Sequence, residues 1–494
     1  MQKRILAALL ASAMLVGIAG CESTASTSDT GSTGGDSKVE DSKDSGDAST
    51  GGDESTGGEE NTGDPDPGKY IEKMTLAEGE GTHLNIQVWN EEWKDYFDKY
   101  IAPQLPDGVT YDFTITPSDK GAYQNKLDAD LPDNVGKDDP IDIFLFEADY
   151  ALKYVDADVT LDVKELGITD ADLSEMYQYT VDVATDKDGK LKGLSWQATP
   201  GLFAYRARIA EDVLGTSDPA EVQEALSSWD KFNKVAADAS AKGYKMLSGY
   251  DDSYRVFSNN VSQPWVDAEK NIIVDDQLMA WVDQTKEFTE KKYNNQTSLW
   301  SDAWTADQGP GADVFGFFYS TWGINFTLMG NSLETPEKEG GKPEVGNGEY
   351  GEWKVCEGPA NYFWGGTWIA AANGTDNKNL VGQILKQFTC NEDFMRDFTK
   401  VTLDYTNNKA AMKSIAEDKE YGSAFLGGQN HVALFYETAP NIKMDKSTKY
   451  DQLLNENFQT AFKDYFNGTI DKETALKNFY ALAQESYADL KVPA

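Results

Sequence analysis

Residues 84–101 read LNIQVWNEEWKDYFDKYI, and the hydrophobic pattern changes its period within this stretch. Residues 84–89 form a short run rich in side chains that favour strands. The large apolar residues that follow recur at the spacing of one helix face, namely Trp93, Tyr96, Phe97, Tyr100 and Ile101. The sequence therefore predicts a strand that leads directly into a helix.

The same succession of patterns continues along the chain. Residues 109–115 alternate apolar and polar side chains, residues 123–131 have a helical pattern, and residues 141–146 form an apolar run typical of a buried strand. Strands that alternate with helices indicate an α/β fold with a parallel sheet. Further strands are expected at 201–206, 314–319 and 364–371, and further helices after Ser228, at 377–388 and through most of the chain beyond Glu392.

Polar and aromatic side chains follow two of these strands. In open α/β sheets, ligands bind beyond the carboxyl ends of the strands. This rule makes Trp89 and Asn90, after the first strand, and Glu147 and Asp149, after the third, candidate binding residues. A solvated strand-end carboxylate is the alternative for Glu147, and a helix N-cap is the alternative for Asp149.

Charge and motifs exclude several functional classes. The chain has 84 acidic and 44 basic residues and a formal net charge of −40, which argues against a nucleic-acid partner. It contains only two histidines and lacks the sequence signatures of P-loop hydrolases, zinc peptidases and serine hydrolases. A G-x-G-x-x-G match at 346–351 precedes a predicted strand instead of a helix, so we expect no nucleotide there. We expect neither a cofactor nor a metal, and a disulfide between Cys356 and Cys390 is left open.

The N-terminus has the parts of an export signal. Lys3 and Arg4 precede an apolar run that ends at residue 20, and residues 18–21, IAGC, resemble the lipobox of bacterial lipoproteins. We therefore predict a signal peptide at 1–20, an acylated Cys21 and a disordered acidic tether within 21–79. These features predict a protein that its lipid holds at the extracellular face of the cytoplasmic membrane.

The twelve tryptophans suggest a class of ligand. An indole ring lies well against the C–H face of a pyranose, while neighbouring polar side chains bond to the sugar hydroxyls. Several tryptophans lie next to Gly, Pro or polar residues, namely Trp196, Trp265, Trp322, Trp364 and Trp368. Each of these is either a ligand contact or a core residue. By contrast, Trp93, Trp229 and Trp281 lie on helical apolar faces and are expected in the core.

Five stretches, in order, resemble a known family. They are 188–194 (DGKLKGL), 202–206 (LFAYR) leading into 209–215 (IAEDVLG), 228–232 (SWDKF), 317–322 (FFYSTW) and 365–370 (GGTWIA). Behind a lipobox and a tether, this order resembles the extracellular solute-binding lipoproteins of bacterial ABC-type carbohydrate importers. Two departures concern the ligand more than the fold: Ser195 and Trp196 replace the usual Pro-aromatic pair, and Arg206 takes a place where Asn is common.

The resemblance implies a two-lobed periplasmic-binding-protein-like fold of type II, with a ligand cleft and a hinge between the lobes. Lobe 1 would comprise 80–198 and 323–405, and lobe 2 would comprise 199–322 and 406–494. The protein would close around an oligosaccharide and deliver it, as a monomer and without chemistry, to the importer permease. Beside the four strand-end candidates, the implied ligand-binding residues are Tyr205, Trp265, Trp322, Trp364 and Gln429. Replacing Trp322 or Trp364 by Ala should then abolish binding with little change in thermal unfolding.

Three other functions remain open at this stage. An extracellular glycoside hydrolase would need two carboxylates, with Glu147 and Glu91 as candidates. A surface protein that adheres to polysaccharide would show an exposed aromatic strip in place of a cleft. A transport protein for a peptide or an organic acid would need basic residues, for which Arg206 and Arg255 are the few candidates. The sequence does not identify the sugar, its linkage or its length.

Overall fold

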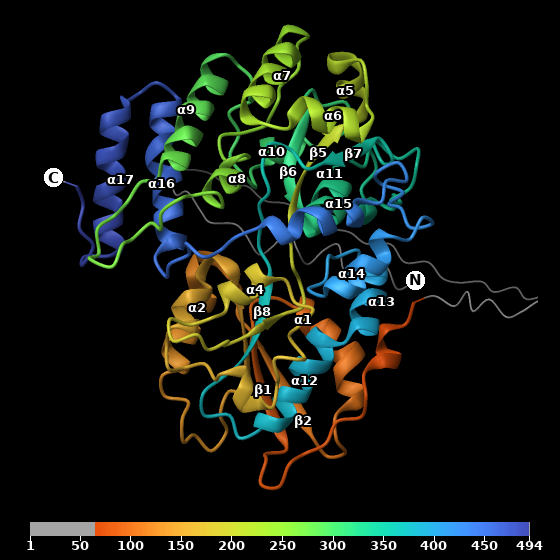
Figure 1. Cartoon of the computed structure of the whole chain (residues 1–494), viewed down its shortest axis with the longest axis vertical. Helices are drawn as coiled ribbons and strands as arrows, with labels where there is room; N and C mark the ends of the chain where they lie inside the picture. The colour runs from red at the N-terminus through yellow and green to blue at the C-terminus, as the bar shows by residue number, and fades with distance from the viewer. Residues whose placement is uncertain (1–64, 494) are drawn as a thin grey trace, which may run out of the picture. The chain divides into compact units, whose positions relative to one another are not determined.

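The structure is a computed structural model that describes residues 65–493 (Figure 1). The predicted signal peptide, Cys21 and most of the predicted tether lie outside the described residues. Between residues 65 and 493, none of the helices combines the length and the apolar character that crossing a membrane requires.

A five-stranded sheet organises the first half of the described chain. Its order is β2-β1-β3-β8-β4, in which β1 runs parallel to β2 and β3, and β8 runs antiparallel to β3 and β4. The predicted parallel sheet is therefore confirmed for its first three strands, and the antiparallel strand β8 joins it from far along the chain. The strands are β1 (His83–Val88), β2 (Thr110–Ile115), β3 (Ile143–Glu147), β4 (Leu194–Ser195) and β8 (Thr367–Ala371).

Aromatic packing joins this sheet to its helices. Phe146 of β3 and Trp368 of β8 are partners in register, and their rings stack with centroids 6.2 Å apart. Trp93 is fully buried and meets Phe97 and Phe388 edge-on, so its predicted place in the core is confirmed. The predicted helix after β1 becomes α1 (Glu92–Tyr96) followed by a π-helical turn (Phe97–Ile101). The other helices around the sheet are α2 (Ala122–Asp130), α3 (Ala151–Val155), α4 (Gln178–Val183), α12 (Lys378–Cys390) and α13 (Glu392–Thr402).

A three-stranded antiparallel sheet organises a second region. Its order is β6-β5-β7, and all six residues of the central strand β5 are buried. The first residue of β5, Gly201, has no space for a side chain, because a Cβ there would lie 2.1 Å from the ring of Tyr362. The strands are β5 (Gly201–Arg206), β6 (Gly316–Ser320) and β7 (Trp353–Cys356), and the nearby helices are α5 (Ala207–Leu214), α6 (Pro219–Leu226) and α7 (Trp229–Ala241). Of the two serines predicted as possible caps of α7, Ser227 and Ser228, it is Ser228 whose Oγ accepts a hydrogen bond from the amide of Lys231.

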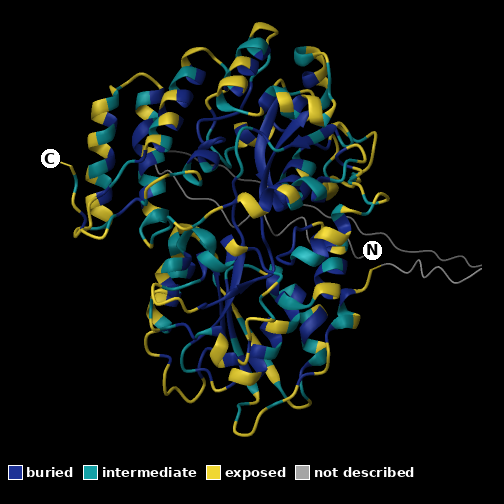
Figure 2. Ribbon diagram, in the orientation of Figure 1, coloured by how far each residue is buried: buried dark blue, intermediate teal, exposed yellow. Residues whose placement is uncertain are grey.

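The C-terminal helices complete this region. Trp281 of α9 is fully buried and packs against Phe458 and Phe466 of α16, which confirms its predicted core position. Figure 2 shows that buried residues concentrate along both sheets and on the inner faces of the surrounding helices. The remaining α-helices are α8 (Tyr254–Ser258), α9 (Asp276–Glu290), α10 (Asp302–Ala306), α11 (Met329–Asn331), α14 (Lys409–Ala416), α15 (His431–Thr438), α16 (Asp451–Phe466) and α17 (Lys472–Ser486).

Connecting segments lead from one sheet to the other. Residues 196–200 run from β4 to β5, and residues 357–366 run from β7 to β8. The two segments are antiparallel, because Pro200 bridges to Phe363 and the Thr199 hydroxyl donates to the carbonyl of Gly365 at 2.9 Å.

The two cysteines in the described part of the chain are both free thiols. Cys356 lies buried in β7 of the three-stranded sheet, and Cys390 ends α12 beside the five-stranded sheet. Burial raises the pKa of the Cys356 thiol to about 12. The disulfide that the sequence left open is therefore not formed.

Candidate ligand-binding site

The carboxyl end of β3 carries a half-buried acid, Glu147. Glu147 pairs in register with Thr367, and its Oε2 accepts a hydrogen bond from the amide of Asp149 at 2.7 Å. Glu147 is thus the N-cap of the short 3₁₀ turn Ala148–Tyr150. The sequence had offered this N-cap role as the alternative for Asp149. Burial raises the pKa of Glu147 to about 8, and the charge of Asp149 adds to this effect.

Asp149 forms an ion pair with a residue distant in the sequence. Both Nη atoms of Arg255, on α8, donate to the two carboxylate oxygens of Asp149. Burial disfavours the charged guanidinium, but the charge and hydrogen bonds of Asp149 outweigh it and raise the pKa of Arg255. The guanidinium also lies 5.9 Å from the ring centroid of Trp364. The pair links the turn after β3 to α8 and to the connection 357–366.

A cluster of aromatic rings adjoins these charges. The centroids of Trp300 and Trp322 are 6.1 Å apart with nearly parallel planes, and Trp364 lies 5.9 Å from Trp300 and 5.2 Å from Trp322. A Cβ on Gly365, whose φ is +76°, would lie 3.2 Å from Nε1 of Trp322 and 3.9 Å from Oε1 of Glu147. The tryptophan rings and the carboxyl group of Glu147 therefore lie close together, next to Gly365. We name Trp300, Trp322 and Trp364 the tryptophan cluster.

The members of the tryptophan cluster differ in exposure. Trp322 is 8% exposed and Trp364 is 5% exposed, whereas Trp300 is half-buried. Trp300 has a φ of +67°, a conformation that bulky residues rarely adopt and that costs on the order of 1–3 kcal/mol. Such strain is found most often at functional sites. Trp300 was not among the residues predicted from the sequence, since its loop position carries no periodic signal.

The residues after β1 lie at the same edge of the five-stranded sheet. Trp89 is half-buried and meets the ring of Tyr123 edge-on at 5.5 Å. The hydroxyl of Tyr123 in turn donates to the backbone carbonyls of Gln87 and Leu145, and so joins the ends of β1 and β3. Asn90 is also half-buried, and its Oδ1 accepts a hydrogen bond from the amide of Glu92.

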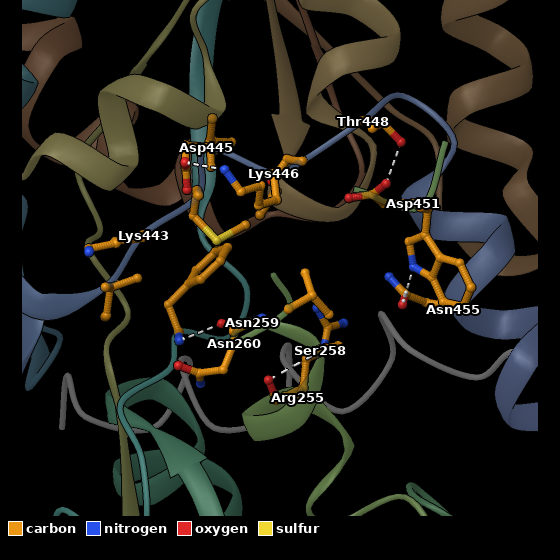
Figure 3. Close-up of a pocket in the computed structure, with 18 of the residues that line it drawn as sticks. Arg255, Ser258, Asn259, Asn260, Lys443, Asp445, Lys446, Thr448, Asp451 and Asn455 are labelled. Carbon is orange, nitrogen blue, oxygen red and sulfur yellow. Dashed lines mark hydrogen bonds and ion pairs between the residues drawn. The ribbon is translucent and has the colours of Figure 1, made fainter. Parts of the chain in front are cut away.

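A cavity of about 460 Å³ adjoins the Asp149–Arg255 pair, and both members of the pair line it. Figure 3 shows Arg255 among the lining residues. It is lined by the turn after β3, by α8 and the segment that follows it, by the connection 357–366, by residues 441–448 and by α16. Trp265 also lines it but is only 6% exposed, and its Nε1 donates to Oδ1 of Asn455 at 3.0 Å. The volume falls within the roughly 300–1,000 Å³ of small-molecule sites.

Sequence comparison identifies the family. Residues 79–424, well over half of the chain, match the family model described as bacterial extracellular solute-binding protein. The chain belongs to this family. None of the curated proteins compared with it has a significantly similar sequence.

Solved structures share the fold of this solute-binding protein. One described as extracellular solute-binding protein family 1 has a TM-score of 0.68 at 18% identity, over 82% of this chain and 100% of that one. The galacto-N-biose-/lacto-N-biose I-binding protein of an ABC transporter from Bifidobacterium longum, in complex with lacto-N-biose, gives 0.61 at 14% identity, over 84% and 100%. An ABC transporter associated binding protein from B. animalis subsp. lactis, in complex with beta-1,6-galactobiose, gives 0.59 at 14% identity, over 84% and 100%. The predicted two-lobed α/β fold of type II is confirmed.

Two predicted site residues of the solute-binding protein lie elsewhere. Tyr205 is fully buried in β5, and its hydroxyl donates to the carbonyl of Ser217 at 3.1 Å. The side-chain amide of Gln429 exchanges two hydrogen bonds with the backbone of Val355 and so holds its loop against β7. The structure brings neither residue to the tryptophan cluster or to the cavity, because both side chains are used within the three-stranded region.

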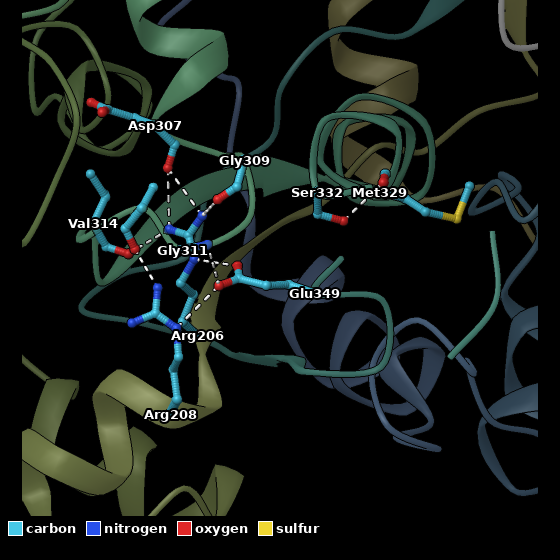
Figure 4. Close-up of polar contacts among 10 residues, drawn as sticks. Arg206, Arg208, Asp307, Gly309, Gly311, Val314, Met329, Ser332 and Glu349 are labelled. Carbon is cyan, nitrogen blue, oxygen red and sulfur yellow. Dashed lines mark hydrogen bonds and ion pairs between the residues drawn. The ribbon is translucent and has the colours of Figure 1, made fainter. Parts of the chain in front are cut away.

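Arg206 of the solute-binding protein is likewise a structural residue (Figure 4). Its Nε donates to Oε2 of Glu349 at 2.6 Å, and its Nη atoms donate to the carbonyls of Asp307, Gly309 and Val314. Its guanidinium lies 4.4 Å from the ring centroid of Trp353. Since the side chain is 1% exposed, Arg206 is not accessible as the anion ligand that the organic-acid alternative would need.

Within residues 65–493, no three His, Cys, Asp or Glu side chains lie close enough together to hold a metal ion. The acidic groups of the site are instead paired with arginine or hydrogen-bonded to backbone amides.

Proposed function

We propose that the protein binds an oligosaccharide outside the cell, closes its two lobes around it and delivers it unchanged to the permease of an ABC importer. The observation that carries this proposal is the tryptophan cluster beside Glu147 and the Asp149–Arg255 pair. Flat indoles next to carboxylate and guanidinium groups are what a pyranose needs for stacking and for bonding its hydroxyls. Complexes of two proteins of the same fold with disaccharides support this ligand class.

Within the proposed site, Trp300 presents the ring on which a sugar stacks. Trp322 and Trp364 are buried behind it, and the indole of Trp322 donates from Nε1 to the carbonyl of Trp364 at 2.9 Å. These two residues therefore fix the orientation of the Trp300 ring. Trp89, Asn90 and Glu147 supply polar and aromatic groups from the lobe opposite.

Lobe closure follows from the placement of the ion pair. We place lobe 1 at 80–198 with 323–405, and lobe 2 at 199–322 with 406–494. Asp149 then belongs to lobe 1 and Arg255 to lobe 2, so their pair stabilises the closed arrangement. A ligand that contacts both lobes shifts the equilibrium further toward closure, and the closed form is what the permease recognises. Acylated Cys21 keeps this monomer at the outer face of the membrane.

The proposal assigns no chemistry to the site. Glu147 accepts a backbone hydrogen bond and carries a raised pKa, but Glu91, the second carboxylate that the hydrolase alternative would use, is exposed to solvent. Binding and release of an intact sugar is the function that these residues support.

Calorimetry tests the proposal directly. The full-length protein in detergent micelles is titrated with maltose-, xylose-, mannose- and cellobiose-type oligomers, and each sugar is recovered and sized afterwards. We expect heat from at least one series and sugars of unchanged length. Absence of heat from every series would contradict the proposed ligand class, and shortened sugars would favour a hydrolase.

A further inference from the structure

The backbone that carries Trp300 is strained at several points. Residues 291–301 join α9 to α10 without regular secondary structure. Lys292, Gln296 and Trp300 all have positive φ values within this stretch, +59°, +61° and +67°. Such conformations persist only where the surrounding structure holds them in place. The position of the Trp300 ring therefore depends on the contacts that hold this segment.

Trp304, on α10, packs against the ring of Trp300. The two ring centroids are 5.0 Å apart, and their planes meet at 62°. Trp304 is fully buried, and it also meets Tyr319 of β6 edge-on at 5.9 Å. Trp304 thus anchors the half-buried Trp300 to the three-stranded sheet. A change in the orientation of Trp304 would move the surface against which Trp300 packs.

Asp252 fixes the orientation of Trp304. Asp252 is buried, and its Oδ1 accepts a hydrogen bond from Nε1 of Trp304 at 2.8 Å. Its Oδ2 accepts from the amides of Ser248 at 2.8 Å and Gly249 at 2.7 Å. Hydrogen bonds to an ionised acceptor are roughly twice as strong as those between neutral groups. The carboxylate therefore ties Trp304 firmly to the loop at Ser248 and Gly249.

The same loop holds the backbone that leads to Trp300. The hydroxyl oxygens of Ser248 and Thr297 are 2.6 Å apart, and the amide of Thr297 donates to the carbonyl of Ser248 at 3.3 Å. Thr297 belongs to the strained segment that carries Trp300. Asp252 consequently acts on Trp300 along two routes, through the ring of Trp304 and through the backbone at Thr297.

The neighbouring acid, Asp251, contributes less. Its Oδ2 accepts from the amide of Leu299 at 3.4 Å and lies 3.9 Å from Nζ of Lys463. Its Oδ1 is buried and has no hydrogen-bond partner among residues 65–493. Because a hydrogen bond of this length is weak, Asp251 adds little to the hold on Trp300.

We propose that Asp252 is a positioning residue for sugar binding, which sets the orientation of the Trp300 ring through Trp304 and through the segment that carries Trp300. This inference rests on the proposed function and adds to it a residue that determines affinity without contacting the ligand. Both oxygens of Asp252 already accept hydrogen bonds from the protein, so its effect on the sugar passes through Trp300.

A double-mutant cycle in sugar affinity tests the inference. Kd is measured by calorimetry for the wild type, Asp252→Asn, Trp300→Ala and the double variant, with the maltose-, xylose-, mannose- and cellobiose-type oligomers. An asparagine presents an NH₂ group on one side, so it cannot accept from Trp304 and from the two amides at once. Asp252→Asn should weaken binding by about 3- to 10-fold when Trp300 is present, and by less than about twofold when Trp300 is absent.

Near-ultraviolet circular dichroism supplies a readout that needs no ligand, because it follows the fixed packing of aromatic rings. The contribution of Trp300 is the spectrum of the wild type minus the spectrum of Trp300→Ala. The same subtraction between Asp252→Asn and the double variant should give a clearly smaller signal, since the ring is no longer held in one orientation.

Asp142→Asn is the matched control. Asp142 is also buried, and its carboxylate accepts hydrogen bonds from one backbone amide and two side chains. Burial raises the pKa of both carboxyls, Asp142 and Asp252, to about 6. Asp142 lies at the amino end of β3 in the five-stranded sheet. Its variant should lose stability in urea as Asp252→Asn does, but keep the Trp300 signal and a Kd within about twofold of the wild type.

Trp304→Phe removes the same hydrogen bond from the opposite partner and keeps a ring against Trp300. It should weaken sugar binding by about 3- to 10-fold, as Asp252→Asn does. If Asp252→Asn does not fold, Trp304→Phe decides the question, and unchanged affinity in this variant would contradict the inference.

The outcomes separate this inference from the proposed function. Unchanged affinity in Asp252→Asn, an equal loss with and without Trp300, or a fully retained Trp300 signal in the dichroism would overturn the positioning role alone. Absence of binding by every sugar would overturn the proposed function and this inference with it.

Discussion

Trp322 donates a hydrogen bond from its indole to the backbone carbonyl of Trp364 at 2.9 Å, and the two rings meet at 73°. This bond lies inside the protein, because neither ring is more than 8% exposed. The two residues consequently support the site more than they face its ligand. That role changes the expected effect of replacing them.

Trp322→Ala should therefore destabilise the fold, in contrast to the expectation from sequence. Removing a buried tryptophan typically costs about 3–5 kcal/mol, through lost burial and the cavity left behind. Trp322→Phe keeps most of the ring and should cost less. Urea denaturation of the purified variants measures both values. If Trp322→Ala had the same urea midpoint of unfolding as the wild type, the packing of the Trp322 ring would not contribute to the stability of the fold.

Replacing Trp300 should separate binding from stability. Trp300→Ala and Trp300→Gly should each weaken sugar binding by roughly tenfold, since a stacking contact contributes on the order of 1 kcal/mol beyond its buried area. The two variants should differ in stability. Glycine adopts the φ of +67° without strain, so Trp300→Gly should be at least as stable as Trp300→Ala.

Trp229 is the matched control for Trp300. It is also half-buried, but it stacks on Phe257 at 4.1 Å, away from the tryptophan cluster. Trp229→Ala should lower stability and leave sugar affinity unchanged. Equal loss of affinity in the Trp229 and Trp300 variants would mean that affinity follows global stability, and Trp300 would lose its assigned role.

Local patterns in the sequence predicted the elements well. The strand at 201–206 was placed at its observed bounds, because a fully buried strand is a continuous apolar run between turn residues. The sequence offered Ser227 or Ser228 as the cap of α7, and the structure selects Ser228. The antiparallel pairing of β8 with β3 is a contact between segments far apart in the chain, and no local period carries it.

The site was predicted only in part, for a physical reason. The strand-end rule led to Glu147 and Asp149, and the structure places both at the carboxyl end of β3, because the edge of a parallel sheet is a geometric consequence of its topology. No such rule exists for tryptophans, because an indole ring in a turn can lie in the core or in a cleft. For this reason Trp300 was not among the candidates and Tyr205, which was, lies fully buried in β5, and Arg255 was considered only as an anion ligand.

Arg206 should be essential for stability and dispensable for ligand recognition. Arg206→Lys keeps the charge but cannot reproduce a fork that bonds Glu349 and three carbonyls, so about 3–5 kcal/mol of stability should be lost. Arg208 also bonds Glu349 but has a side chain that is 39% exposed, and Arg208→Lys should cost less than about 1 kcal/mol. Chemical denaturation compares the two. A folded Arg206→Lys that loses sugar binding selectively would return Arg206 to the site.

Glu147 should make the protein less stable as the pH rises. Its pKa is raised to about 8 in the folded state, mainly by burial, against an ordinary value near 4.5 in the unfolded chain. Between these values the folded state retains a proton that the unfolded state has lost. Unfolding therefore releases a proton, and the free energy of unfolding falls as the pH increases from about 5 to 8.

Glu147→Gln isolates this contribution from that of other buried acids. Glu92, whose pKa burial and Asp404 also raise to about 8, should produce a pH dependence of the same sign that persists in the variant. Denaturation of wild type and variant at pH 5, 6, 7 and 8 should therefore show two declining curves, with the wild-type curve the steeper. Parallel curves would mean that Glu147 is ionised across this range, and its carboxylate would then meet the ligand as a charged acceptor.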